Sequence, residues 1–212
     1  MSDGIQIRKP AQIAARPDRS RLFDVAAGQS GYFTSEQAAE SGYSRALLAY
    51  HAKAGSFVRV RRGLYRFREY PPSPREHVLA AWLAVGKDNA VVSHESALEI
   101  LDLSDVVPDA VHLTVPRSRR NLPSIVGARI HTSSRPIGRE DKSVRDGIMV
   151  TSPTRSILDA AESGTSPEQI EAAVVEAVKR GLTTSQRLRK GADERGKRVS
   201  DIVSRGLAEA RA

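Results

Sequence analysis

The hydrophobic and polar positions of the chain change their period several times, and these changes predict its elements. Residues 19–27 place Leu22, Phe23 and Ala26 on one side of a helix, which Gly28 ends. Residues 1–17 before it mix charged side chains with two prolines and show no sustained period. The pattern therefore predicts a mobile basic arm over residues 1–17, followed by a first helix.

Two short helices are predicted next. Thr34 and Gln37 have the spacing of a capping box, which opens a helix that runs to about Glu40. After a turn at Gly42, Ser44 can cap a second helix that ends near residue 55. The apolar side of this second helix is expected to consist of Leu47, Leu48 and Tyr50. Two short helices joined by a glycine-containing turn are typical of a helix-turn-helix.

Residues 57–67 alternate as the two strands of a hairpin with a turn at Arg62 and Gly63. We expect Val58 and Val60 to share the packed face with Tyr65 and Phe67. The outer face would then carry four arginines, namely Arg59, Arg61, Arg66 and Arg68. No acidic residue lies between positions 57 and 68, so a hairpin that contacts a nucleic-acid backbone is favoured over one that is merely solvated. A helix-turn-helix followed by such a hairpin is a winged helix.

The second half of the chain alternates between strand and helix patterns. A stiff proline-rich linker covers residues 70–74, and Ser73 with Glu76 has capping-box spacing for a following helix. Strands are predicted near residues 91–92, 110–116, 127–132 and 146–151, with helices at 93–101, from 152, from 166 and in a basic tail from 184. The tail is expected to be an exposed helical surface. The predicted fold is therefore α+β, with a winged helix over 18–70 and a mixed α/β domain over 75–212.

Charge is unevenly distributed along the 212 residues. The formal net charge is +8, and residues 1–70 contribute +6 of it, with 12 Lys and Arg against 6 Asp and Glu. The remaining residues carry 21 basic and 19 acidic side chains. The basic third is expected to attract phosphate backbones. The absence of cysteine and of any long apolar run predicts a cytoplasmic protein without a membrane partner.

The sequence contains no motif that carries enzyme chemistry. There is no H-E-x-x-H, no nucleotide-binding loop and no G-x-S-x-G. The five histidines are scattered, and His94, His112 and His131 are interpreted as structural side chains. We therefore expect no catalytic residue, no metal site, no cofactor and no enzyme activity.

The candidate DNA-binding residues lie on the second helix and the hairpin. They are Ser44, Arg45, His51, Lys53, Arg59, Arg61, Arg62, Arg66 and Arg68. A second basic cluster follows a predicted strand and could contact DNA or a partner protein, or could be a solvated loop. It consists of Arg117, Arg119 and Arg120.

The order of these segments resembles the AbiEi family of antitoxins from type IV abortive-infection toxin–antitoxin systems. The resemblance begins with "GYFTSEQAAESGYS" and "FVRVRRGLYRF", continues through "VVSHESALEILDL", "VHLTVPRSRR" and "GIMVTSPTRSILDAA", and covers about residues 20–180. It implies an N-terminal domain that binds inverted repeats in its own promoter, with the helix Ser44–Lys53 in the major groove. It also implies a C-terminal domain that neutralises a nucleotidyltransferase-like toxin.

Two other interpretations concern the C-terminal half. Longer proteins with similar segments append a nuclease domain, whose metal site requires a D/E-x-K pair on a strand, and no predicted strand here carries one. The remaining alternative is a winged-helix transcriptional regulator whose C-terminal domain senses a ligand or dimerises, without a toxin partner. The sequence shows no feature that separates this alternative from an antitoxin.

Overall fold

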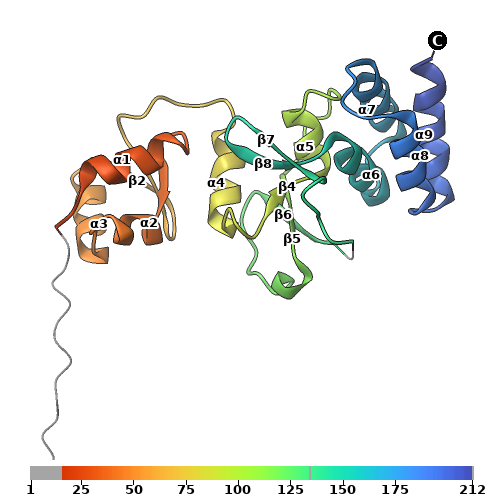
Figure 1. Ribbon diagram of the computed structural model, residues 1–212. Helices are drawn as coiled ribbons and strands as arrows, with labels where there is room; N and C mark the ends of the chain where they lie inside the picture. The colour runs from red at the N-terminus through yellow and green to blue at the C-terminus, as the bar shows by residue number, and fades with distance from the viewer. Residues whose placement is uncertain (1–15, 134, 212) are drawn as a thin grey trace, which may run out of the picture. The chain divides into compact units, whose positions relative to one another are not determined.

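The structure is a computed structural model that describes residues 16–133 and 135–211. The predicted basic arm lies almost entirely outside these residues. The chain divides between Pro71 and Pro72 into two compact units, which are described separately (Figure 1). Both units mix helices with strands, which confirms the α+β prediction.

In its described residues, the first unit combines three helices with a small antiparallel sheet. Its elements in chain order are α1 (Arg19–Ala27), β1 (Tyr32–Thr34), α2 (Ser35–Glu40), α3 (Arg45–Lys53), β2 (Phe57–Arg61) and β3 (Leu64–Phe67). The strand order is β1-β3-β2, so the hairpin gains a third strand that the sequence pattern did not predict. Helices α2 and α3 with this sheet form a winged helix.

Local capping fixes where the helices of the first unit begin. The capping box of α2 is present, because Gln37 N donates to Thr34 Oγ1 at 3.3 Å and Thr34 N donates to Gln37 Oε1 at 2.9 Å. Ser44 caps α3 by accepting a hydrogen bond from the backbone N–H of Leu47 at 3.2 Å. The buried side chains of this unit's core are Leu22, Ala26, Phe33, Ala38, Tyr43, Leu48, Phe57 and Phe67.

A five-stranded mixed sheet forms one part of the second unit (Figure 1). Its strands are β4 (Val91–Val92), β5 (Val111–Val115), β6 (Ala128–Thr132), β7 (Lys142–Arg145) and β8 (Ile148–Thr151), in the order β6-β5-β4-β8-β7. The β5–β6 and β4–β8 pairs are parallel, and the other two pairs are antiparallel. Strand β7 was not predicted, and every residue of β5 is buried. Helices α4 (Glu76–Val85) and α5 (His94–Ile100) pack against the sheet.

Helices α4 and α5 begin without a side-chain capping hydrogen bond at the N-cap. Ser73 N donates to Glu76 Oε1 at 3.3 Å, but helix α4 begins one residue after Arg75, which is its N-cap. Ser93 is the N-cap of α5, yet its side chain makes no capping hydrogen bond. Its hydroxyl is hydrogen-bonded to other side chains instead.

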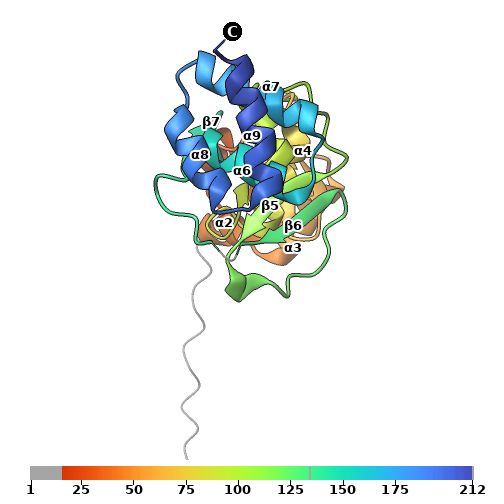
Figure 2. The same ribbon diagram turned by 90° about the vertical axis from the view of Figure 1, so that its right-hand side faces the viewer.

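Four further helices form a bundle, which faces the viewer in Figure 2. They are α6 (Pro153–Ser163), α7 (Pro167–Lys179), α8 (Ser185–Asp193) and α9 (Lys197–Glu209). The prediction that the tail is merely an exposed surface is wrong, because one face of both tail helices is buried. The buried side chains include Leu188, Val199, Ile202, Val203 and Leu207. Among the residues that the structure describes, no helix is long and apolar enough to cross a membrane.

Candidate nucleic-acid interface and a polar pocket

Helix α3 presents one exposed face. Arg45, Ala49 and Lys53 are spaced at i, i+4 and i+8 and are all exposed. Within the described chain, neither Arg45 nor Lys53 forms an ion pair with a carboxylate. Tyr50 was predicted on the apolar side of this helix, and that prediction is wrong because its side chain is 64% exposed. The exposed side of α3 therefore offers the cations Arg45 and Lys53 and the phenol ring of Tyr50. Tyr50 was not among the predicted DNA-binding residues.

Two of the candidate residues on α3 have structural contacts. The Ser44 hydroxyl accepts the capping hydrogen bond described above. The His51 ring is partly buried and packs against the rings of Phe57 at 5.0 Å and Tyr43 at 5.7 Å, measured between centroids. Of the four residues proposed on this helix, Arg45 and Lys53 have the most freedom to reach a ligand.

The wing differs from the predicted hairpin in its register. Phe57 lies opposite Phe67, Val58 lies opposite Arg66, and Arg59 lies opposite Tyr65, so each of these pairs shares a face. The prediction that Val58 and Val60 share the packed face with Tyr65 and Phe67 is therefore wrong. A one-residue shift exchanges the two faces of a strand, and Phe57 rather than Val58 fills the core. A bulge between Arg59 and Arg61 changes the register again.

This register separates the wing arginines into two groups. Arg59, Arg61 and Arg62 have no carboxylate partner in the part of the chain that the structure describes. Arg66 instead lies over the Tyr32 ring at 6.0 Å and donates to the carbonyl oxygen of Tyr70. Arg68 donates from Nε to the carbonyl oxygen of Gly55. The last two side chains connect the wing to its own unit, which leaves the first three as the cations available to a ligand.

The second basic cluster lies in the other unit. Residues Arg117–Arg119 form a short 3-10 helix directly after β5, and Arg120 follows it. All three arginines, Arg117, Arg119 and Arg120, are exposed, and none forms an ion pair within the described residues. The cluster is therefore available to a partner of negative charge.

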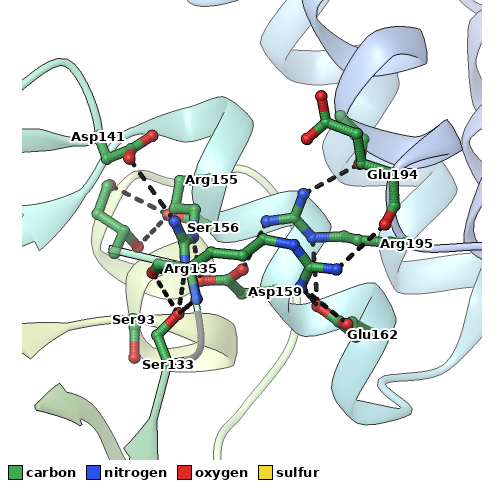
Figure 3. A network of polar contacts seen from close by, with 12 residues as sticks. Ser93, Ser133, Arg135, Asp141, Arg155, Ser156, Asp159, Glu162, Glu194 and Arg195 are labelled. Carbon is green, nitrogen blue, oxygen red and sulfur yellow. Dashed lines mark hydrogen bonds and ion pairs between the residues drawn. The ribbon is translucent and has the colours of Figure 1, made fainter. Parts of the chain in front are cut away.

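A network of charged side chains joins the sheet of the second unit to the bundle (Figure 3). Arg155 on α6 is buried and donates to Asp159 Oδ2 at 2.6 Å and to Ser133 Oγ at 2.7 Å. Arg195 donates to the other oxygen of Asp159 at 2.9 Å. Arg135 donates to both carboxylate oxygens of Glu162, at 3.0 and 2.9 Å. The carboxylates of Asp159 and Glu162 are therefore each paired with at least one guanidinium group. Such pairing is needed because an unpaired charge is costly to bury.

A cavity of about 230 Å³ opens beside this network. Its lining residues are His94, Thr114, His131, Thr132, Ser133, Arg135, Arg155, Asp159, Glu162 and Ser163. They come from the start of α5, from β5 and β6, from the segment after β6 and from α6. No local sequence pattern indicates this pocket, because its lining residues are spread over about 70 positions of the chain.

Three of the five histidines, which the sequence pattern places far apart, lie together in the fold, and two of them, His94 and His131, line this cavity. The rings of His94 and His131 stack with their centroids 3.7 Å apart, and the ring of His112 lies 5.0 Å from that of His131. His112 is 2% exposed and His94 is 7% exposed. Burial lowers the pKa of His94 to about 2 and the pKa of His131 to about 4, and it also lowers the pKa of His112. All three imidazoles are therefore neutral at neutral pH.

Among the comparisons with known proteins, the family match falls within the first unit. Residues 20–68 match the family described as transcriptional regulator, AbiEi antitoxin. Among solved structures, the chain is similar to the RV2827C protein from Mycobacterium tuberculosis, with a TM-score of 0.60 and 17% identity over 91% of this chain and 78% of that one. This likeness concerns the fold alone. A search of curated proteins found no match.

Proposed function

We propose that this chain is an antitoxin transcriptional regulator of the AbiEi type, which the family match over residues 20–68 supports, and that it represses its own operon and neutralises a nucleotidyltransferase-like toxin. Helix α3 and the wing bind inverted repeats in the promoter. The second unit is responsible for neutralising the toxin. No enzyme activity of the chain itself is part of this proposal.

The observation that supports DNA binding is the set of cations without carboxylate partners on α3 and the wing. Residues 41–68 contain no acidic side chain, and the five available cations are Arg45, Lys53, Arg59, Arg61 and Arg62. Cations that replace condensed counterions along a duplex supply most of the sequence-independent binding free energy. The N-terminal residues of a recognition helix reach base edges in the major groove, and Arg45 is the first residue of α3.

The exposed arginines Arg117, Arg119 and Arg120 are the surface that we propose for the toxin. They project from the second unit directly after a buried strand, so they are held by a rigid element. A toxin surface rich in carboxylates would complement them.

The cavity beside the charged network favours a second candidate function. A winged-helix regulator could bind a small polar ligand there and have no toxin partner, since ligand sites combine a concave shape with a few converging polar groups. The charges in this cavity are already paired with each other, which makes this function the weaker of the two. Growth of cells that express a nucleotidyltransferase-like toxin together with this chain separates the two functions, because only an antitoxin restores growth.

The wing arginines provide the test of DNA binding. Replacing Arg59, Arg61 and Arg62 together by Ala should weaken binding to promoter DNA and to unrelated DNA alike. The slope of log K against log salt should fall by about 0.9 per phosphate contact removed, so by about 2 to 3 for the triple variant. Fluorescence anisotropy over a range of salt concentrations measures this slope.

The control is a second triple variant with the same change in net charge. Arg187, Arg189 and Lys190 are exposed on α8 in the other unit and can be replaced by Ala. That variant should retain the wild-type slope. An unchanged slope in the wing variant would show that these arginines do not contact DNA.

A further inference from the structure

The three clustered histidines are not used by the proposed function, and their arrangement points to a ligand. One ring nitrogen from each of His94, His112 and His131 lies within 4.8 Å of the others. We propose that these histidines bind a divalent transition-metal ion, with Zn²⁺ as the natural occupant. The proposal is independent of DNA binding and of toxin neutralisation.

The fold itself brings the three side chains together. Strands β5 and β6 are parallel neighbours, and Thr114 lies opposite His131, so His112, two residues before Thr114, projects from the same face. Ser93 N donates to the carbonyl oxygen of His112 at 3.0 Å, which fixes the start of α5 against β5. His94 follows Ser93 and has a φ of +53°, a conformation that is uncommon for a residue other than glycine and that clusters at functional sites.

Several ring nitrogens of the trio are buried without a hydrogen-bond partner. They are Nδ1 and Nε2 of His112 and Nε2 of His131. Buried polar atoms nearly always have a hydrogen-bond partner. Three buried nitrogens without one, all in the same cluster, therefore indicate that a ligand binds there. A metal ion accepts an electron pair from one nitrogen of each ring, so it would satisfy one nitrogen of His112 and one of His131.

Neighbouring polar side chains are placed to orient these histidines. The Ser93 hydroxyl lies 2.8 Å from Nδ1 of His94, and its oxygen can accept a hydrogen bond from that nitrogen when the nitrogen carries the proton. Nε2 of His112 lies 3.9 Å from a carboxylate oxygen of Glu95 and 3.9 Å from one of Asp109. A nearby carboxylate orients a metal-ligating histidine and raises its basicity.

The charges around the trio are compatible with a cation. The guanidinium groups of Arg155 and Arg129 act electrostatically on these histidines, and each is paired with a carboxylate. Arg155 Nε donates to Asp159 at 2.6 Å, and Arg129 donates to Asp109 at 3.0 Å. The imidazoles are held neutral by burial, which is the form that coordinates a metal.

The ligand set decides which metal fits. Three neutral nitrogens suit Zn²⁺ and its transition-metal neighbours, whereas Mg²⁺ and Ca²⁺ require oxygen ligands. A three-histidine Zn²⁺ site keeps a fourth position open. Because His94 and His131 also line the cavity, that position would face the cavity and could hold water or an anionic group.

The test is a titration of the full-length chain, freed of metal with a chelator, by Zn²⁺ in a calorimeter. We expect one equivalent to bind, and Mg²⁺ not to compete. Loss of a carboxylate that orients a metal-ligating histidine costs roughly 10–100-fold in metal affinity, so Glu95→Gln should weaken Zn²⁺ binding within that range and His131→Gln should weaken it by more. His77→Gln is the matched control, because His77 is exposed on α4 of the same unit and lies outside the trio, and it should bind as the wild type does.

A second measurement on the wild-type chain does not depend on how the variants fold. Addition of Zn²⁺ should shift the ring ¹⁵N resonances of three histidines and leave those of His51 and His77 unchanged. Circular dichroism shows whether His131→Gln is folded. Absence of stoichiometric binding, equal affinity in a folded His131→Gln variant, or shifts of His51 or His77 in place of the trio would each overturn the proposal.

Discussion

Arginines with the same charge have different roles in this protein, and their partners decide which. Arg155 is buried and paired with Asp159, so it stabilises the second unit. Arg66 lies over an aromatic ring and donates to a backbone carbonyl. Arg45 is exposed at the first position of α3 and has no carboxylate partner among the described residues. Only an arginine of this last kind can pair with a base without first losing a contact.

We predict that Arg45→Ala relaxes the sequence preference of DNA binding. An arginine that donates two hydrogen bonds to guanine is worth about 1–3 kcal/mol of discrimination. The ratio of affinities for promoter DNA and scrambled DNA should therefore fall by about 5- to 150-fold, as measured by competition binding.

Lys53→Ala is the comparison for this prediction, because Lys53 lies at the other end of the same helix. Its loss should weaken binding to both DNAs by the same factor, as expected for a phosphate contact. If Arg45→Ala keeps the full preference for the promoter, Arg45 is at most a phosphate contact as well.

At the scale of elements, the bundle depends on a close approach of α7 and α9. Gly206 on α9 is buried, and a Cβ atom at this position would lie 2.9 Å from Val174 Cβ and 3.0 Å from the carbonyl oxygen of Glu171. Backbone atoms cannot move aside as the end of a flexible side chain can. Glycine is therefore required by packing here, although it disfavours a helix by about 1 kcal/mol relative to alanine.

We predict that Gly206→Ala destabilises the second unit despite the better helix propensity of alanine. Overpacking costs about 1–3 kcal/mol, so the net loss in the free energy of unfolding should reach up to about 2 kcal/mol, and Gly206→Val should lose more. Ser204→Ala, on the exposed face of the same helix, should leave stability unchanged or slightly raised. Denaturant unfolding measures these differences, and a stabilised Gly206→Ala variant would show that the two helices can separate at low cost.

At the scale of the whole molecule, each unit has its own buried core. The aromatic cluster around Phe33, Phe57 and Phe67 belongs to the first unit, and the bundle core around Ile157 and Val203 belongs to the second. Two cores of this kind favour independent folding. We propose that the two activities are divided in the same way.

We predict that residues 1–71 alone bind promoter DNA, more weakly than the full chain if the second unit aids pairing on the repeat. Residues 72–212 alone should restore growth to cells that express the toxin, without repressing the promoter. Promoter activity and growth, measured for each half and for the full chain, test both statements. Rescue by residues 1–71 alone would contradict this division, and failure of both halves would show that the activities need the intact chain.

The sequence by itself determined the local features of this fold. The capping box of α2, the serine caps of α3 and α6, and the strands from Val111 and Ala128 follow from residue types at short spacing. Such features need only neighbours along the chain, so periodicity and capping rules reveal them. The family resemblance rested on the same short segments, and the matched residues 20–68 lie among them.

Only the tertiary structure decided which side chains meet across long distances in the chain. The register of the wing depended on Phe57 filling the core and on a bulge, neither of which alternation of polar and apolar residues can show. Of the tail helices, α9 packs against α7, and α8 packs against α9 and α6. The modest apolar content of the tail did not predict this packing. His94, His112 and His131 are separated by 18 and 19 positions, and the parallel pairing of β5 with β6 brings two of them together. Contacts of this kind depend on which strands and helices pack together, which no local pattern encodes.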